Sequence, residues 1–181
     1  MRKILSLGIA VLAMSAVAAP TFAADSDQSK LSAAIESGDL VFAPAPSDVA
    51  FNAIKITGRP EETNGTFQGF GVVDARGTGA GYHLTLQATR FKSDAGLLPA
   101  DSLMIGVAKI NAGRGVTSQA PKWAGERTVD NEKGIVVLSA DVDEGLGLFN
   151  IEDSPMTLAI PASVKAGTYT SVLEATLVTG P

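Results

Sequence analysis

The chain has 181 residues, with no cysteine and a single histidine, His83. Without cysteine it has no disulfide, no thiol nucleophile and no cysteine-based metal site, so we expect an apolar core to hold the fold. One histidine excludes a histidine metal cluster, and no serine lies in a G-x-S-x-G elbow. His83 falls on the polar face of a predicted strand, which favours a solvated side chain over a general base. We therefore expect no cofactor and no enzymatic activity.

Long apolar runs are also scarce. The run at residues 4–17 follows Arg2 and Lys3, and small residues precede a cleavage point after Ala23. This pattern is typical of a secretory signal peptide, here residues 1–23. No later run approaches the roughly 18 apolar residues that cross a bilayer. The sequence thus predicts a secreted mature chain with no membrane span.

Basic residues are outnumbered, with 14 Lys and Arg against 19 Asp and Glu. Removal of residues 1–23 takes away two basic residues and no acidic one, which moves the formal net charge from −5 to −7. An acidic chain lacks the basic surface that binds nucleic acid or anionic lipid. A mature chain of this length is enough for one domain with a sizeable core.

Short apolar or alternating runs, separated by turn residues, account for most of residues 39–181. The clearest is residues 82–89, where every second side chain from Tyr82 to Ala88 is apolar, the period of a half-buried strand. Further strands are predicted at 40–43, 51–57, 67–74, 103–110, 135–140, 148–151, 156–160 and 169–178. Strands recurring about every ten residues predict a single all-β domain, an antiparallel β-sandwich or a Greek-key-like barrel.

Three segments fall outside this pattern. Residues 24–38 form a lead-in; within it, residues 27–38 could form a short helix or an edge strand, and we favour an edge strand or a disordered stretch. Residues 111–134 form a long irregular loop with the only tryptophan, Trp123. The pair Glu61–Glu62 beside Asn64–Gly65 is predicted to be a surface turn.

One acidic stretch resembles the start of a calcium loop. Asp141 and Asp143 are spaced as oxygen ligands, and Glu152 falls twelfth from Asp141. Gly145 supplies no ligand at the fifth position, and Leu146 replaces the glycine needed at the sixth. A solvated turn is favoured, and calcium binding here is left open.

Two aromatic residues are candidates for contact with a ligand or partner, because exposed aromatics supply affinity at such surfaces. Gly77, Gly79 and Gly81 let the chain turn tightly and bring Tyr82 to the start of its strand. There Tyr82 either packs in the core or faces a ligand. Trp123 either covers an edge of the sandwich or makes a contact.

Residues 72–85, VVDARGTGAGYHLT, resemble the segment V-x-D-x-R-G-x-x-x-G-W-x-L-T of WxL-domain surface proteins. GLGLF at 145–149, LAIP at 158–161, AGTYTS at 166–171 and ATL at 175–177 follow in the order of that family's later motifs. Ser37 to Leu40 also fits the family's opening. Tyr82 and Ala175 stand where the two W-x-L motifs have tryptophan.

The resemblance implies a secreted domain on the surface of Gram-positive bacteria that attaches noncovalently to peptidoglycan. It implies other surface proteins as possible partners beside the cell wall. The sequence ends at Pro181 without an apolar tail or sorting motif, which agrees with noncovalent retention. The candidate ligand-binding residues are Tyr82, Leu84, Trp123, Tyr169 and Leu177.

An alternative function is a self-assembling subunit of a surface layer or extracellular fibre. In that case exposed strand edges, or a donated segment at residues 24–38, complete a neighbour's sheet. A secreted hydrolase is a distant third hypothesis.

Overall fold

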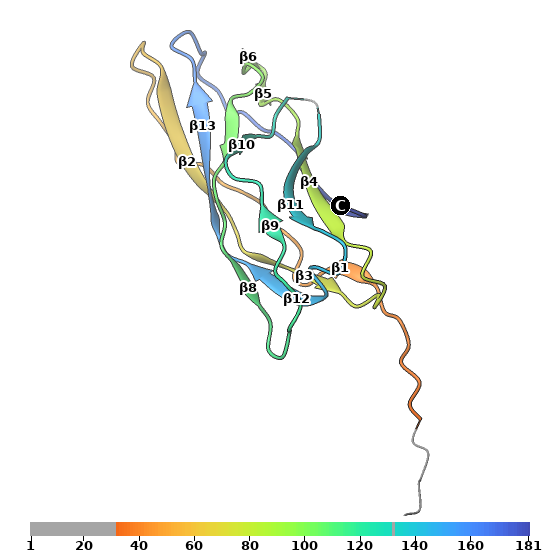
Figure 1. Cartoon of the computed structure of the whole chain (residues 1–181). Helices are drawn as coiled ribbons and strands as arrows, with labels where there is room; N and C mark the ends of the chain where they lie inside the picture. The colour runs from red at the N-terminus through yellow and green to blue at the C-terminus, as the bar shows by residue number, and fades with distance from the viewer. Residues whose placement is uncertain (1–31, 132) are drawn as a thin grey trace, which may run out of the picture. The chain divides into compact units, whose positions relative to one another are not determined.

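The computed structural model describes residues 32–131 and 133–181, so the predicted signal peptide lies outside the described residues. Residues 36–181 form one compact unit (Figure 1). Of the preceding unit, residues 32–35 are described, and they are exposed and have no regular structure. Within the described ranges every regular element is a strand, and no helix is long and apolar enough to cross a membrane. The predicted all-β class is confirmed.

The strands occur along most of the unit. They are β1 Leu40–Phe42, β2 Glu61–Phe67, β3 Phe70–Asp74, β4 Tyr82–Ala88, β5 Lys92–Ser93, β6 Gly96–Leu97, β7 Leu103–Ile105, β8 Ile110–Ala112, β9 Lys122–Trp123, β10 Arg127–Thr128, β11 Ile135–Ala140, β12 Gly147–Ile151, β13 Ser154–Ile160 and β14 Leu173–Thr179.

All the strand pairs are antiparallel, and most belong to three sheets of four strands. Sheet A has the order β1-β3-β12-β8, sheet B has β10-β7-β13-β2, and sheet C has β14-β4-β11-β9. Strands β5 and β6 form a separate hairpin.

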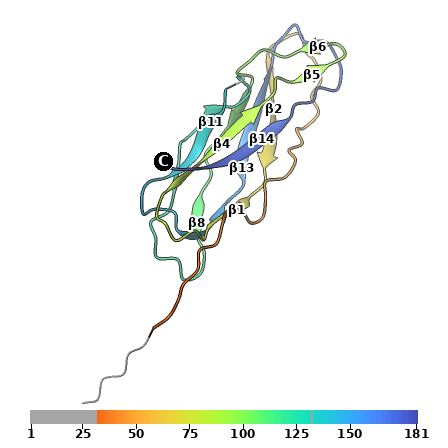
Figure 2. The same ribbon diagram turned by 90° about the vertical axis from the view of Figure 1, so that its right-hand side faces the viewer.

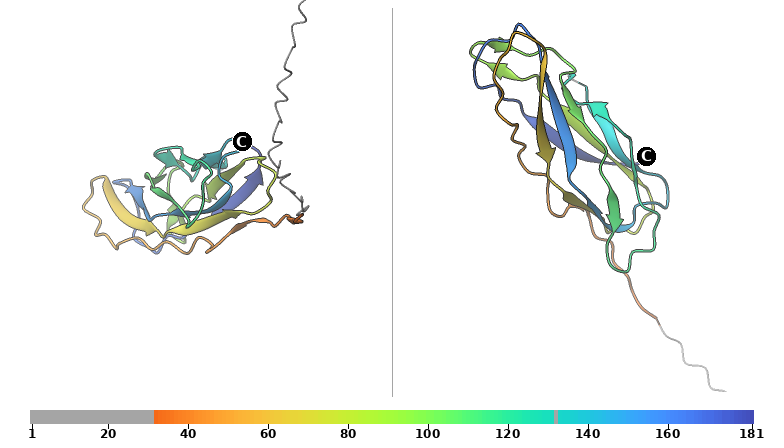
Figure 3. Two further views of the ribbon diagram at one scale, coloured as in Figure 1. Left: turned by 60° about the horizontal axis from the view of Figure 1, so that its bottom comes forward. Right: turned by 90° about the vertical axis from the view of Figure 1, so that its left-hand side faces the viewer.

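Two chain segments each run through both sheet A and sheet B with only a short break. Two residues separate β2 from β3, and two separate β12 from β13. Together these sheets form one layer of a β-sandwich, and sheet C forms the other (Figures 2 and 3).

The core lies between the layers and follows the alternation predicted for β4. The side chains of Tyr82, Leu84, Leu86 and Ala88 are buried, whereas those of His83 and Thr85 between them are partly exposed. The opposite layer contributes buried residues that include Phe67, Phe70, Val72, Ile105, Ile151, Met156 and Leu158. Burial of this apolar surface is the main favourable contribution to folding in a chain without disulfides.

Two predictions near β2 are wrong. Residues 51–57 do not form a strand: Phe51 makes an isolated bridge to Gly65, and Ile54 and Ile56 are exposed. Residues 61–65, predicted to be a turn, belong to β2, which pairs along its whole length with β13. Pairing with β13 overrides the turn-forming tendency of Asn64–Gly65, because strand formation depends on the neighbouring strand more than on the intrinsic preference of single residues.

Three boundaries also differ from the prediction. The run at 103–110 splits into β7 and β8, which belong to different sheets. The chain changes sheets at Gly106, whose N–H donates to the carbonyl of Pro155. The last strand begins at Leu173, so Tyr169 precedes it, and the long loop at 111–134 contains the short strands β9 and β10.

Candidate functional site

The glycine-rich turn between β3 and β4 is built on a buried ion pair. Asp74, at the end of β3, has a fully buried side chain and accepts hydrogen bonds from Arg76 Nε at 2.9 Å and Nη2 at 2.7 Å. The backbone N–H of Arg76 donates to the same carboxylate at 3.1 Å. The hydrogen bonds from Arg76 hold the pKa of Asp74 below its ordinary value, although burial acts in the opposite direction.

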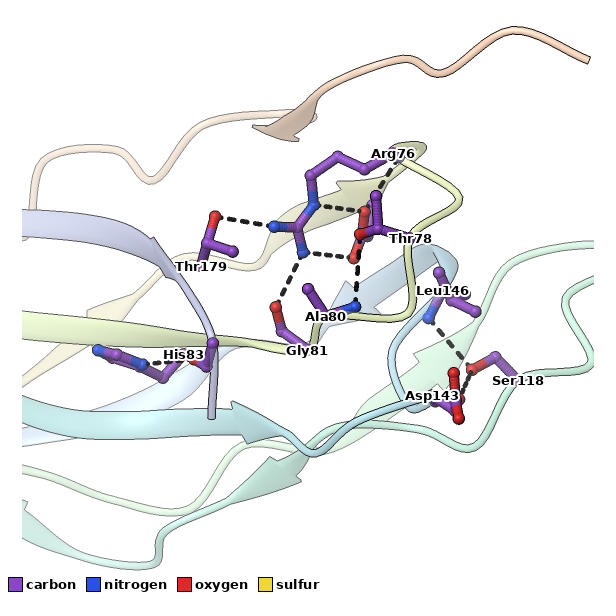
Figure 4. A network of polar contacts seen from close by, with 11 residues as sticks. Arg76, Thr78, Ala80, Gly81, His83, Ser118, Asp143, Leu146 and Thr179 are labelled. Atoms are coloured by element: carbon purple, nitrogen blue, oxygen red, sulfur yellow. Dashed lines mark hydrogen bonds and ion pairs between the residues drawn. The ribbon is translucent and has the colours of Figure 1, made fainter.

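Arg76 also connects segments from two sheets. Its guanidinium donates to the carbonyl of Gly81 at 2.9 Å and to Thr179 Oγ1, at the end of β14, at 2.8 Å (Figure 4). Gly77, Gly79 and Gly81 all have positive φ, as the turn prediction requires. A Cβ on Gly81 would lie 2.5 Å from the carbonyl oxygen of Ala140, so the close approach of β4 to β11 depends on glycine here.

Tyr82 is a core residue in this structure. Its side chain is fully buried, and its hydroxyl has no hydrogen-bond partner among the described residues. A Cβ on Gly145 would lie 2.7 Å from Cε1 of the ring, so this glycine leaves room for the tyrosine. Burial raises the pKa of the Tyr82 hydroxyl above its ordinary range, with a further contribution from the nearby Asp74 carboxylate.

The other predicted ligand-binding residues lie in three separate places. Leu84 is buried beside Tyr82, and half-buried Leu177 pairs with it from β14. Trp123 lies at the opposite edge of sheet C, where β9 pairs with β11, and its Nε1 donates to the carbonyl of Gly106 at 3.0 Å. Half-buried Tyr169 donates its hydroxyl to the carbonyl of Lys165 at 3.1 Å. The five residues form no common surface, and their part in ligand binding stays a prediction.

A large pocket beside Tyr169 lies between β14 and the segment 43–51, which we name the strap. This pocket, the edge pocket, has a volume of about 750 Å³. Phe51, Phe67 and Phe91 line its interior, and Leu173 and Ala175 line it from β14. Tyr169, Thr170 and Ser171 add polar groups. Sequence reasoning missed it because its walls come from separate segments whose pairing no local pattern shows.

A second, polar surface also borders the strap, at Asp48 and Ala50. Phe51 bridges Gly65, and Asn52, directly after the strap, donates its backbone N–H to the carbonyl of Asn64, so this end of the strap lies alongside β2. The exposed residues Asp48, Asn52, Asn64, Thr66 and Gln68 line a shallow pocket of about 360 Å³, the polar groove. Within the described part of the chain, the side chains of Asn52, Thr66 and Gln68 make no hydrogen bond, so their donors and acceptors remain available.

The acidic turn after β11 does not bring its three predicted oxygen ligands together. Asp141 pairs with Lys122 at 2.8 Å, and Glu152 accepts a hydrogen bond from Asn111 Nδ2 at 2.8 Å. Ser118 Oγ donates to the backbone carbonyl of Asp143 at 3.3 Å (Figure 4). Among the residues that the structure describes, no three carboxylate or histidine side chains are grouped so as to hold a metal ion.

A family model described as "WxL domain surface cell wall-binding" matches residues 19–181. No curated protein and no solved structure matches the chain. The match agrees with the resemblance seen in the sequence and covers all the described strands.

The ion pair at the turn predicts a pH dependence of stability. Because the pKa of Asp74 is lower in the fold than in the unfolded chain, its contribution is present above about pH 4 and is lost as the pH falls through the folded-state value. We expect Asp74→Asn to lower the free energy of unfolding at neutral pH by about 3 kcal/mol, since Arg76 loses its charged partner. Urea unfolding measured from about pH 7 to pH 3 should show that Asp74→Asn loses less free energy of unfolding on acidification than the wild type does. The exposed Asp141→Asn is the control, and equal acid-induced losses in wild type and Asp74→Asn would contradict the prediction.

The unpaired hydroxyl of Tyr82 predicts an unusual response to its removal. Burying a hydroxyl without a hydrogen bond costs about 1–3 kcal/mol, so Tyr82→Phe should unfold at the same or a higher urea concentration than the wild type. Tyr82→Ala, which leaves a cavity in the core, should lower the free energy of unfolding by about 3–5 kcal/mol. A large destabilisation by Tyr82→Phe would show that the hydroxyl has a partner in solution.

Proposed function

We propose that this chain, which belongs to the WxL family of surface cell-wall-binding domains, is secreted, binds peptidoglycan noncovalently and catalyses no reaction. The family match is the observation that carries the proposal, because it spans all the described strands. Cell-wall binding at the surface is the function of the family. Secretion is supported by the predicted signal peptide, residues 1–23.

The buried acidic groups are engaged in structural contacts, which supports a binding function without catalysis. Asp74 is bound by Arg76, and Asp130 accepts backbone hydrogen bonds from Ser102 at 3.1 Å and Leu103 at 3.0 Å. Burial raises the pKa of Asp130, and the backbone N–H groups that donate to its carboxylate act against that rise. Each of these carboxylates thus stabilises a strand end.

The polar groove is the surface that we propose for peptidoglycan. Wall glycan and its peptides present hydroxyl and amide groups, and an amide side chain can both donate to and accept from such groups. Asn52, Thr66 and Gln68 line the same groove, and their amide and hydroxyl groups are free. Asp48 is the one charged residue among those that line it. Several modest hydrogen bonds add up to reversible, noncovalent attachment.

Cosedimentation of the mature chain, residues 24–181, with purified wall sacculi tests this function. We expect saturable binding that is weakened at least about tenfold by the combined substitution Asn52→Ala, Thr66→Ala and Gln68→Ala, because each lost hydrogen bond is worth about 1 kcal/mol. The matched control is Thr117→Ala, Gln119→Ala and Thr176→Ala, three exposed uncharged residues that do not line the polar groove. Unfolding curves confirm that both variants are folded.

The two parts of the proposal fail separately. If the folded wild-type chain does not sediment with sacculi, peptidoglycan binding is wrong. If it binds and both triple variants bind equally well, the polar groove is the wrong surface.

A second function, a self-assembling subunit of a surface layer or fibre, is favoured by one observation. Strand β14 is the outermost strand of sheet C, and no described strand pairs with its other edge. An unpaired edge offers backbone donors and acceptors to a strand from another molecule.

Size-exclusion chromatography with light scattering tests assembly. If the chain assembles by strand addition, residues 24–181 should form oligomers that grow with concentration, and residues 39–181 should stay monomeric at the same concentrations. A monomeric mature chain at every concentration would exclude this second function.

A further inference from the structure

The edge pocket lies where one more strand would fit beside sheet C. On one side β14 pairs with β4 over residues 173–179, and the bonds between Thr170 and Lys92 extend this pairing toward the hairpin. On the other side the strap forms the opposite wall. Figure 2 shows β14 at the edge of its layer, with the strap segment beside it. A strand in this position would have a backbone partner along one edge and an apolar interior beneath it.

The apolar interior of the edge pocket would suit a strand with an apolar side chain at every second position. Leu173, Ala175 and Leu177 are the half-buried residues of β14, and the residues between them are exposed. The small side chain of Ala175 leaves space in front of Phe51 and Phe91, whose rings pack edge to face at 5.8 Å between centroids. An added strand would place every second side chain into this space, because side chains alternate across a strand.

The chain itself has a segment of this kind before β1. Leu31, Ala33 and Ile35 are apolar at every second position; at the alternate positions Lys30, Ser32 and Glu36 are polar and Ala34 is small. The described residues 32–39 are all exposed and have no regular structure. Ile35 is 96% exposed, more than any other large apolar side chain among the described residues.

The direction of the chain before β1 points to a second copy as the source of this segment. Gly38 donates to the carbonyl of Ala75, and Ala75 donates to that of Asp39, so these residues lie beyond the β1 end of sheet A. The strap and the edge pocket begin at the opposite end of β1, after Phe42. The chain therefore enters β1 from the end opposite the pocket.

We propose that the edge pocket receives the lead-in segment of a second copy of this chain, which adds to β14 as a further strand and places Ile35 beside Ala175. This inference rests on the second function proposed above, and it assigns the donor and the acceptor. Repeated from copy to copy, the contact is head-to-tail and generates a filament rather than a closed dimer.

Cysteine cross-linking tests the contact directly, because the natural chain has no cysteine. Mature chains with Ile35→Cys are mixed with mass-tagged chains with Ala175→Cys and oxidised. We expect a disulfide-linked pair of one tagged and one untagged chain, at a yield at least about fivefold above that with Glu174→Cys, since adjacent side chains of a strand point to opposite faces. Equal yields from the two partners would overturn the proposal.

Two further variants separate this contact from its alternatives. A single chain with both Ile35→Cys and Ala175→Cys should form linked oligomers, and a disulfide closed within a monomer would overturn the proposal. Ala175→Trp fills the edge pocket and should abolish concentration-dependent oligomers, with wall cosedimentation unchanged. Persistence of the oligomers, or loss of wall binding in the folded variant, would overturn the assignment of the pocket without deciding whether the polar groove binds the wall.

Discussion

The ion pair between Asp74 and Arg76 is the interaction on which the arrangement of the sandwich depends. A buried carboxylate must be paired, and the guanidinium that pairs with it has further donors to spare. Those donors reach the carbonyl of Gly81, just before β4, and the hydroxyl of Thr179, at the end of β14. One charged group at the end of sheet A thereby holds the start of β4 and the end of β14, two neighbouring strands of sheet C. The glycines of the turn have a matching role, because a side chain on Gly81 would push β4 away from β11.

The fold class could be predicted from sequence because its signal is local. Alternation in β4 survives in the structure residue for residue, since one face of that strand is buried and the other is not. The errors have a common cause. Residues 51–57 have a good strand pattern but no partner along their length, whereas β2 has a poor pattern and a full-length partner in β13. Which segments pair is a property of the whole chain, and a window of a few residues does not contain it.

The candidate surfaces show the same limit more strongly. An aromatic at the start of an amphipathic strand is compatible with a ligand contact or with the core, and Tyr82 is buried because Gly145, far along the chain, leaves space for its ring. The indole of Trp123 donates to the carbonyl of Gly106, a residue between β7 and β8 that no local pattern around Trp123 identifies as its partner. The polar groove and the edge pocket could not be anticipated, because the strap brings ordinary residues from distant segments together. The order of the motifs along the sequence is enough to indicate the family. The two surfaces can be identified only once the fold has brought their residues together.

The corner formed by Asp74, Arg76 and Thr179 also has a mechanical meaning. Gly38 is bonded to Ala75 on one side of this corner, and Gly180 is bonded to Gly81 on the other. The chain segments that enter and leave the sandwich, at Gly38 and Gly180, are therefore both bonded within a few residues of the same ion pair. Tension applied between them, as on a surface protein exposed to flow, would be borne by the bonds at this corner before it reached the layers. The resistance of the domain to pulling would then be set by these few contacts, and the large apolar core would stay unloaded until they broke.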